Sequence, residues 1–292
     1  MPDPSFGHHA RLSFAPAGTA IASFTEACEF VSESIHKEQA ILETAGLRGT
    51  RSHPVERTRD GTSVIRGEIR LHATPALLDL LLPRILGTPK AADNFALAES
   101  LPEFDLLLDR VARRFLYQGC RVDKGVFRGK AGGLLEVTLE IVGKSELVSQ
   151  LPFPAIAPPI DLPYVFHDGA MTLLGVPRQF VDFELTIDNR LAVRFANSPS
   201  ATDISPIDRI VTFACTLPFT SAETDLYGHG ALGVGGATLS FTNGPSHLAF
   251  TLPMLQFPDQ TPVVAGRGEI LLALRGTARK SGGIAEVAVV SG

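Results

Sequence analysis

The chain has 292 residues, of which 45% are hydrophobic and 20% are charged, and its formal net charge is −5. This length allows one large β domain or two domains of roughly 100–150 residues. Spanning a bilayer takes about 18 consecutive apolar residues, and no apolar run in the sequence approaches this length. No block of Lys and Arg suggests tight phosphate binding. The first residues lack a basic region followed by an apolar one, so we expect no secretory signal.

The cysteine, glycine and proline content indicates a mainly β fold. Cys28, Cys120 and Cys215 are far apart, odd in number and surrounded by strand-like apolar sequence, which predicts buried thiols in a reducing compartment. Gly (27) and Pro (21) are abundant and Trp is absent. This balance favours short strands and many turns over helices.

The first part of the chain contains an unusually long polar loop. Residues 1–27 are rich in Pro, Gly and Ala and predict an irregular arm, and a strand-like stretch runs from Glu29 to Ile41. The loop Glu43–Asp60 that follows is longer than most connections in compact domains, and such loops are commonly functional or disordered. Its basic and acidic residues are interleaved, so we expect salt bridges with a neighbouring subunit through Arg48, Arg51, Glu56 and Arg57.

Two predicted strands beyond this loop have one polar and one apolar face. Residues alternate with the period of a strand in Val64–Leu71 and in Leu134–Val142, and the latter is expected to form a hairpin with Arg113–Phe127. Thr74-Pro75 predicts the start of a short helix that ends at Pro83 or Gly87, because an N-cap Thr and a proline at the first helical position favour helix initiation. The polar positions are Arg66, Glu68, Arg70, His72, Glu136, Thr138 and Glu140.

A proline-rich segment divides the chain into two similar halves. Five prolines in the thirteen residues Leu151–Pro163 disfavour helix and sheet and predict a semi-rigid linker. Val64–Leu80 aligns without a gap to Ile210–Leu226, 146 residues later, although few residues are identical. The repeat predicts two tandem domains, residues 28–150 and 164–292, each a small β sandwich or half-barrel with one short flanking α-helix.

The second half is expected to repeat the first, element by element. Its strand Ile210–Leu217 has the polar positions Thr212 and Thr216, and its helix is expected at Thr220–Tyr227. Further strands are predicted at Ala237–Phe241 and His247–Leu252, which pair across a turn, and at Glu269–Leu274. The chain is therefore expected to contain two copies of one strand-and-helix unit.

The chain resembles the tail tube proteins of long-tailed (siphovirus-like) bacteriophages, of the tandem two-domain type, from about Ala10 to about Arg279. The most specific parts are Glu33-Ser34 before the long loop, Gly119-Cys120 with the hairpin that follows, and Phe183–Asn189. In that family, rings of tube domains stack into the hollow tube through which the genome leaves the capsid. The resemblance implies a structural protein of the virion tail, made in the host cytoplasm, with no cofactor and no enzymatic activity.

The resemblance also implies the partners of the chain. Three two-domain chains would close a pseudo-six-fold ring by pairing their sheet edges, and the rings would stack. A tape measure protein, a tail terminator and baseplate or tip proteins are implied as further partners. DNA would pass without tight binding, along a lumen lined by the polar positions of the two strand sets, which have little net charge.

Other kinds of chemistry have only isolated signals in the sequence. Gly228–Gly233 matches G-x-G-x-x-G, but a dinucleotide site needs a strand before the motif and a helix after it, and the sequence predicts the reverse order. No two histidines have the helical spacing of a zinc site. Glu136 and Glu140, about 13 Å apart along one strand, are too distant for a glycosidase pair.

Three alternatives to a tube protein are therefore considered. One is a monomeric sandwich whose polar faces simply contact water. Another is a tandem β-sandwich protein that binds a ligand or a carbohydrate, although such modules usually present Trp and Tyr, and this chain has no Trp and three Tyr. A hydrolase is disfavoured because the sequence contains no catalytic motif.

Overall fold

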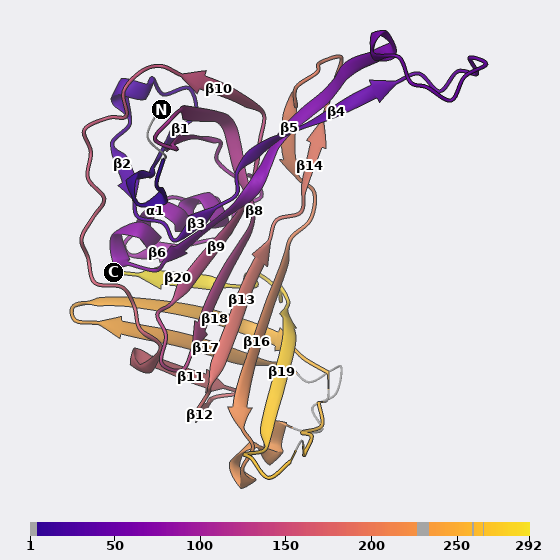
Figure 1. Cartoon of the computed structure of the whole chain (residues 1–292). Coiled ribbons are helices and arrows are strands. Elements are labelled where there is room, and N and C mark those ends of the chain that lie inside the picture. The colour runs from indigo at the N-terminus through magenta and orange to yellow at the C-terminus, as the bar shows by residue number, and fades with distance from the viewer. Residues whose placement is uncertain (1–4, 227–233, 259, 265) are drawn as a thin grey trace.

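The structure is a computed structural model that describes residues 5–226, 234–258, 260–264 and 266–292. In this part of the chain the fold is mainly β, with one α-helix and several short 3-10 helices. Figure 1 shows long strands from both halves of the chain lying side by side, with the helix and shorter strands behind them.

The first half contributes the α-helix and ten strands. Their bounds are β1 (Arg11–Pro16), β2 (Glu26–Cys28), β3 (Ser32–Glu33), β4 (His36–Glu43), β5 (Thr58–His72), α1 (Pro75–Leu86), β6 (Asn94–Phe95), β7 (Phe104–Asp109), β8 (Arg114–Lys130), β9 (Glu136–Gly143) and β10 (Ser145–Ser149). Its 3-10 helices are Gly7–His9, Ile21–Ser23 and Val55–Arg57.

The second half contributes ten further strands. Their bounds are β11 (Gly169–Leu173), β12 (Val176–Arg178), β13 (Asp182–Asp188), β14 (Leu191–Arg194), β15 (Asp203–Pro206), β16 (Ile210–Pro218), β17 (Val234–Asn243), β18 (Ser246–Gln256), β19 (Leu271–Ala278) and β20 (Ala288–Ser291). Its 3-10 helices are η4 (Phe166–Asp168) and η5 (Ser221–Leu226).

One antiparallel sheet, which we call the shared sheet, contains strands of both halves. Its order is β3 and β4 at one edge, then β5, β9, β8, β13, β16 and β19. The halves meet where β13 pairs with the lower part of β8, from Asp182 opposite Lys130 to Asp188 opposite Lys124. We call this β8–β13 pairing the internal seam. It makes the two halves parts of one sheet.

Two smaller sheets lie behind the shared sheet and enclose the core. The upper part of β8 turns into a sheet with the order β2–β1–β7–β8–β10. In the second half the order is β12–β11–β17–β18–β20–β6, so β6 of the first half joins a sheet of the second. One cluster of buried apolar side chains spans both halves, and the rings of Phe127 and Phe250 lie 4.9 Å apart within it.

The helix α1 forms where the sequence predicts it and runs further. Thr74 is its N-cap and accepts a hydrogen bond from the Leu77 amide at 3.3 Å. The helix continues through Pro83 to Leu86, and Gly87 ends it in the left-handed conformation that glycine adopts without strain. The amide of Asn189, just after β13, donates to the Ile85 carbonyl at 3.1 Å, so the end of the helix is fixed to the internal seam.

Two expectations from the sequence are wrong in detail. Residues 11–16 are not irregular, because β1 pairs with β7 and buries Leu12 and Phe14. The second copy has a 3-10 helix at Ser221–Leu226 instead of an α-helix. Thr220 begins this helix as Thr74 begins α1, with its hydroxyl bonded to the Ala222 amide at 3.1 Å. Five glycines between positions 228 and 236, however, follow instead of helix formers, and Tyr227 lies outside the described residues.

Candidate functional site

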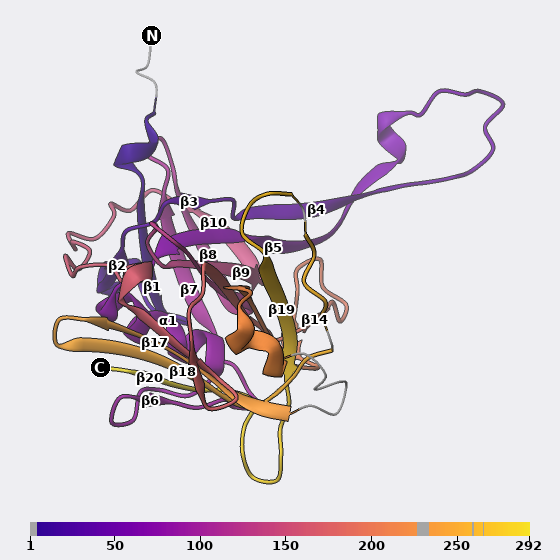
Figure 2. The same cartoon turned by 90° about the horizontal axis from the view of Figure 1, so that it is seen from below.

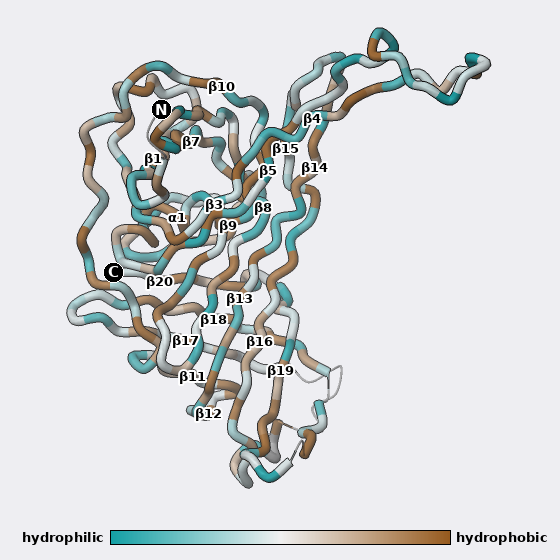
Figure 3. The backbone as a smooth tube through the Cα atoms, in the orientation of Figure 1, coloured by the Kyte–Doolittle hydropathy of each residue, from teal (hydrophilic) through white to brown (hydrophobic). Residues whose placement is uncertain are grey.

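The face of the shared sheet that points away from the core is the candidate site. Along β13 and β16 buried and partly exposed residues alternate without interruption, and Figure 3 shows the matching alternation of hydrophobic and hydrophilic residues. The outward residues of neighbouring strands stand in rows. One row runs Arg70, Thr138, Val126, Thr186, Thr212 and Thr277, and the next runs His72, Glu136, Arg128, Glu184, Ala214 and Arg275.

Charges on this face are closely balanced and partly paired. Glu184 accepts from Arg128 at 2.7 Å across the internal seam, and Glu140 accepts from Lys124 at 2.6 Å. The hydrogen bond to Glu140 raises the pKa of Lys124. Four rows, from the level of Glu68 to that of Thr216, contain five cations and six anions: Arg70, Lys124, Arg128, Lys130 and Arg275, and Glu68, Glu136, Glu140, Asp182, Glu184 and Asp188.

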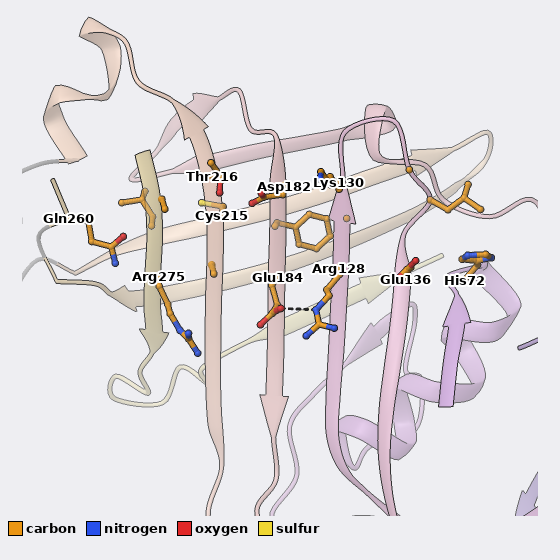
Figure 4. A pocket seen from close by; sticks show the side chains of 17 residues that line it. His72, Arg128, Lys130, Glu136, Asp182, Glu184, Cys215, Thr216, Gln260 and Arg275 are labelled. Carbon is orange, nitrogen blue, oxygen red and sulfur yellow. Dashed lines mark hydrogen bonds and ion pairs between the residues drawn. The ribbon is translucent and has the colours of Figure 1, made fainter. Parts of the chain in front are cut away.

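A shallow groove of about 730 Å³ crosses the lower end of this face. Figure 4 shows its charged and polar side chains on strands of both halves, with Gln260 beyond the edge strand β19. At the other end, the ribbon β14–β15 covers the face, and its Ile204 packs on Val64 and Val142. The groove therefore lies across the junction of the two halves and contains both signs of charge.

The structure places the nine predicted polar residues together. All of them lie on this one face, and the expected opposite face of β5 is confirmed, because Ile65, Ile69 and Leu71 are buried. The residues differ in exposure. Arg66, Arg70 and Glu136 are exposed, Thr138 is buried among its neighbours, and the others have intermediate exposure.

Sequence reasoning missed the charged residues at the centre of the face. Lys124, Arg128 and Lys130 come from β8, whose inward positions include Gly125 and Gly129. Because these glycines replace apolar residues, the alternation that identifies a two-faced strand is weak there. Asp182 and Glu184 lie on β13, around the start of the stretch Phe183–Asn189 on which the family resemblance rests, but nothing in the sequence indicated that this stretch pairs with β8.

The long loop forms the tip of a hairpin that projects from the body. The β4–β5 ladder continues to Glu43 opposite Thr58, so the unpaired part is shorter than the expected loop. Figures 1 and 2 show this hairpin extending well beyond the rest of the molecule. Arg48 bonds to Thr44 within the loop, Arg51 is exposed, and Glu56 and Arg57 lie in a 3-10 turn. Apolar side chains are exposed on the hairpin: Ile41, Leu42, Leu47 and Val55.

The described residues include no clear candidate for a reactive nucleophile or a metal site. The three cysteines are free and buried, as the sequence predicted. Burial raises the pKa of Cys215 to about 12 and that of Cys28 and Cys120 further, which disfavours the reactive thiolate. No His, Cys, Asp and Glu group among the described residues could hold a metal ion, and no described helix is long and apolar enough to cross a membrane. The motif Gly228–Gly233 lies outside the described residues.

Comparison with known protein families gives one match. A family model described as "Phage tail tube protein" matches residues 7–278, which is nearly the full length of the chain. No curated protein matches the chain.

Proposed function

Because the chain belongs to the phage tail tube protein family, and so is a structural protein of the virion tail, we propose that it polymerises into stacked rings that form the hollow tube for genome delivery. The observation that supports this most strongly is the shared sheet. Strands of both halves form one sheet with a polar outer face, and among the described strands no further strand pairs with the outer side of β3–β4 or with most of the outer side of β19.

Free sheet edges are the natural contact between copies of this chain. An exposed edge presents unpaired N–H and C=O groups and pairs readily with another strand. If each shared sheet pairs edge to edge with the next, the sheets close into a barrel and no edge remains. The chain already joins two similar halves in this way, so three chains would supply six units around one pore.

The polar face would then line the pore. A strongly basic wall would bind phosphates and slow the passage of DNA, since phosphate contacts dominate non-specific affinity. The face has five cations and six anions in its four lower rows, and its cations Arg128 and Lys124 are paired with carboxylates. A wall of this composition suits passage of DNA better than binding.

The projecting hairpin β4–β5 would connect one chain to its neighbour or to the next ring. Its tip contains Arg48, Arg51, Glu56 and Arg57, and exposed apolar side chains such as Leu47 and Val55 lie beside them. Apolar side chains gathered on a projecting element are typical of contact surfaces. A tape measure protein, a tail terminator and baseplate or tip proteins would be further partners of the tube, as the family resemblance implies.

The proposal is tested by imaging the purified protein and measuring the mass of its assemblies. We expect negative-stain microscopy to show rings or tubes, and native mass spectrometry to give a ring of three chains of 31.2 kDa each. A chain that stays monomeric under all conditions would overturn the proposed function. A ring of six chains would leave the tube function in place and overturn the three-chain arrangement.

A further inference from the structure

The internal seam offers a template for contact between chains. In it β8 and β13 pair with Val126 opposite Thr186, Arg128 opposite Glu184 and Lys130 opposite Asp182. In the spatial order of the shared sheet, the seam joins the last strand of the first half, β8, to the first strand of the second half, β13. A contact between copies that repeated this geometry would join the last strand of one chain to the first strand of another.

The strand equivalent to β13 in the first half is β3 with the start of β4. Ser32 lies opposite Arg70 in one half, and Asp182 lies opposite Thr216 in the other. Arg70 and Thr216 are equivalent under the 146-residue repeat, so Ser32 corresponds to Asp182. By the same offset Ile35 corresponds to Leu185, and the side chains of Ile35 and Leu185 are both fully buried. Unlike β13, however, β3 and β4 pair only with β5 among the described strands.

The position equivalent to the lower part of β8 lies beyond β19, where the described residues form no strand. β9 pairs with β5 and then with β8, whereas β19 pairs with β16 and only its last two residues pair with β18. Extending that β18–β19 register from Gln256 opposite Thr277 would bring Gln260 opposite Ala273. Residues 260–264 therefore correspond to the lower part of β8.

At both edges of the shared sheet, side chains of the same chain bind the backbone groups that would face a neighbouring chain. Gln260 lies beside β19 (Figure 4). With its amide turned, it donates to the Ala273 carbonyl and accepts from the Arg275 amide at 3.3 Å, as a neighbouring strand would. At the other edge the Ile35 amide donates to Glu33 at 2.9 Å, and its carbonyl accepts from Tyr117 at 3.1 Å and from Arg110. These contacts close edges that would otherwise invite indiscriminate pairing.

We propose that residues 260–264 of one chain pair with the β3–β4 edge of a second copy in the register of the internal seam. Gln260 then lies opposite His36, and Val264 opposite Ser32, of the neighbouring chain, and backbone hydrogen bonds replace the side-chain contacts at both edges. This contact rests on the proposed tube function and specifies which residues meet in the ring. It also gives partners to Val263 and Val264, which are 73% and 69% exposed.

A cysteine pair tests this register. Val264→Cys and Ser32→Cys are placed in one chain, at two exposed positions, while the native cysteines are buried. Within one chain β3 and β19 are six strand spacings apart, roughly 29 Å along the sheet, whereas disulfides need Cα atoms within about 7 Å. Oxidised assemblies should therefore give covalent species larger than a dimer on a non-reducing gel, and each single variant at most a dimer.

The matched control is Val263→Cys with Ser32→Cys, because position 263 points to the opposite face of the strand. The register would be overturned if rings of the Val264→Cys, Ser32→Cys variant gave no covalent species larger than a dimer. It would also be overturned if only the Val263→Cys, Ser32→Cys variant gave them. Either result would leave the tube function standing. If the Val264 pair prevents assembly, hydrogen exchange of the unmodified chain decides. The amides of residues 260, 261, 263 and 264 should be protected in rings and not in free chains, and equal exchange would overturn the contact. A chain that never forms rings would overturn the proposed function and the contact together.

Discussion

At the residue scale, two glycines of β8 explain how α1 and the aromatic core come so close to the shared sheet. A Cβ at position 125 would lie 2.9 Å from Ile85 Cγ2, and one at position 129 would lie 2.4 Å from a ring carbon of Phe183. Distances below 3.0 Å are not found for real side chains. Glycine at these positions is therefore a packing requirement at the internal seam.

Gly125→Ala is expected to destabilise the fold. The added methyl group overpacks against Ile85, and overpacking of a close-packed core typically costs about 1–3 kcal/mol. Urea denaturation should show a lower midpoint with an unchanged slope. Gly46→Ala is the control, since a Cβ there would meet no atom within 4 Å. Gly125→Ala should cost less in an Ile85→Ala background, which lacks Cγ2, and an unchanged midpoint for Gly125→Ala in the unmodified chain would contradict this account.

At the element scale, the two halves use equivalent hairpins differently. The β4–β5 hairpin of the first half projects into solvent (Figure 2), whereas the short ribbon β14–β15 of the second half folds back onto Val64 and Val142. Ala201 and Ile204 supply apolar side chains to that second contact. The exposed side chains of the first hairpin have no such partner in the described structure, which is why we assign the hairpin to contact with another chain.

Deleting Gly46–Arg57 should abolish polymerisation without unfolding the chain. The deletion joins Ala45 to Thr58 next to the last ladder pair, Glu43 opposite Thr58, and removes no core residue. Thermal unfolding is therefore expected to change little, while sedimentation and microscopy should show no tubes. The full-length double variant Leu47→Ser with Val55→Ser is the matched control for loss of apolar contacts alone. Normal tubes from the deletion variant would show that the hairpin is dispensable.

At the scale of the whole molecule, charge balance is the property that suits the polar face to its proposed role. The net charge of the chain is −5, and on the polar face the basic side chains of β8 lie between the acidic side chains of β9 and β13. Ring symmetry would repeat this pattern around the pore. Arg66 and Arg70 would then form rings of their own, but Glu38 lies 3.5 Å from Arg66 and Glu68 lies 3.9 Å from Arg70.

The assembled protein is expected to show no measurable affinity for duplex DNA near physiological salt. Non-specific binding requires several uncompensated cations along a groove, each of which adds about one unit to the salt slope. A fluorescence anisotropy titration at about 150 mM salt measures this affinity. The variant Glu136→Lys with Glu184→Lys, which makes the face basic, should bind DNA with a steep salt dependence. Micromolar binding by the unmodified protein would show that the pore binds DNA tightly and would contradict this prediction.

The sequence by itself determined the strands with strict alternation, the start of α1 and the tube family. The strands and the helix start depend on neighbours within a few residues, such as Thr74 with Pro75 or the alternating residues of β16, so local sequence is sufficient for them. The repeat of 146 residues also predicted that polar positions of both halves would be equivalent. All nine predicted residues lie on one face of the shared sheet.

Only the tertiary structure decided how the halves join. The pairing of β8 with β13, the place of β1 in the first core and the joining of β6 to β20 are contacts between residues far apart in the chain. A strand's own alternation gives its two faces but not its neighbour, because backbone hydrogen bonds are the same for any sequence. The charged residues at the centre of the polar face could be identified only from the structure, because the β8–β13 pairing places Arg128 next to Glu184.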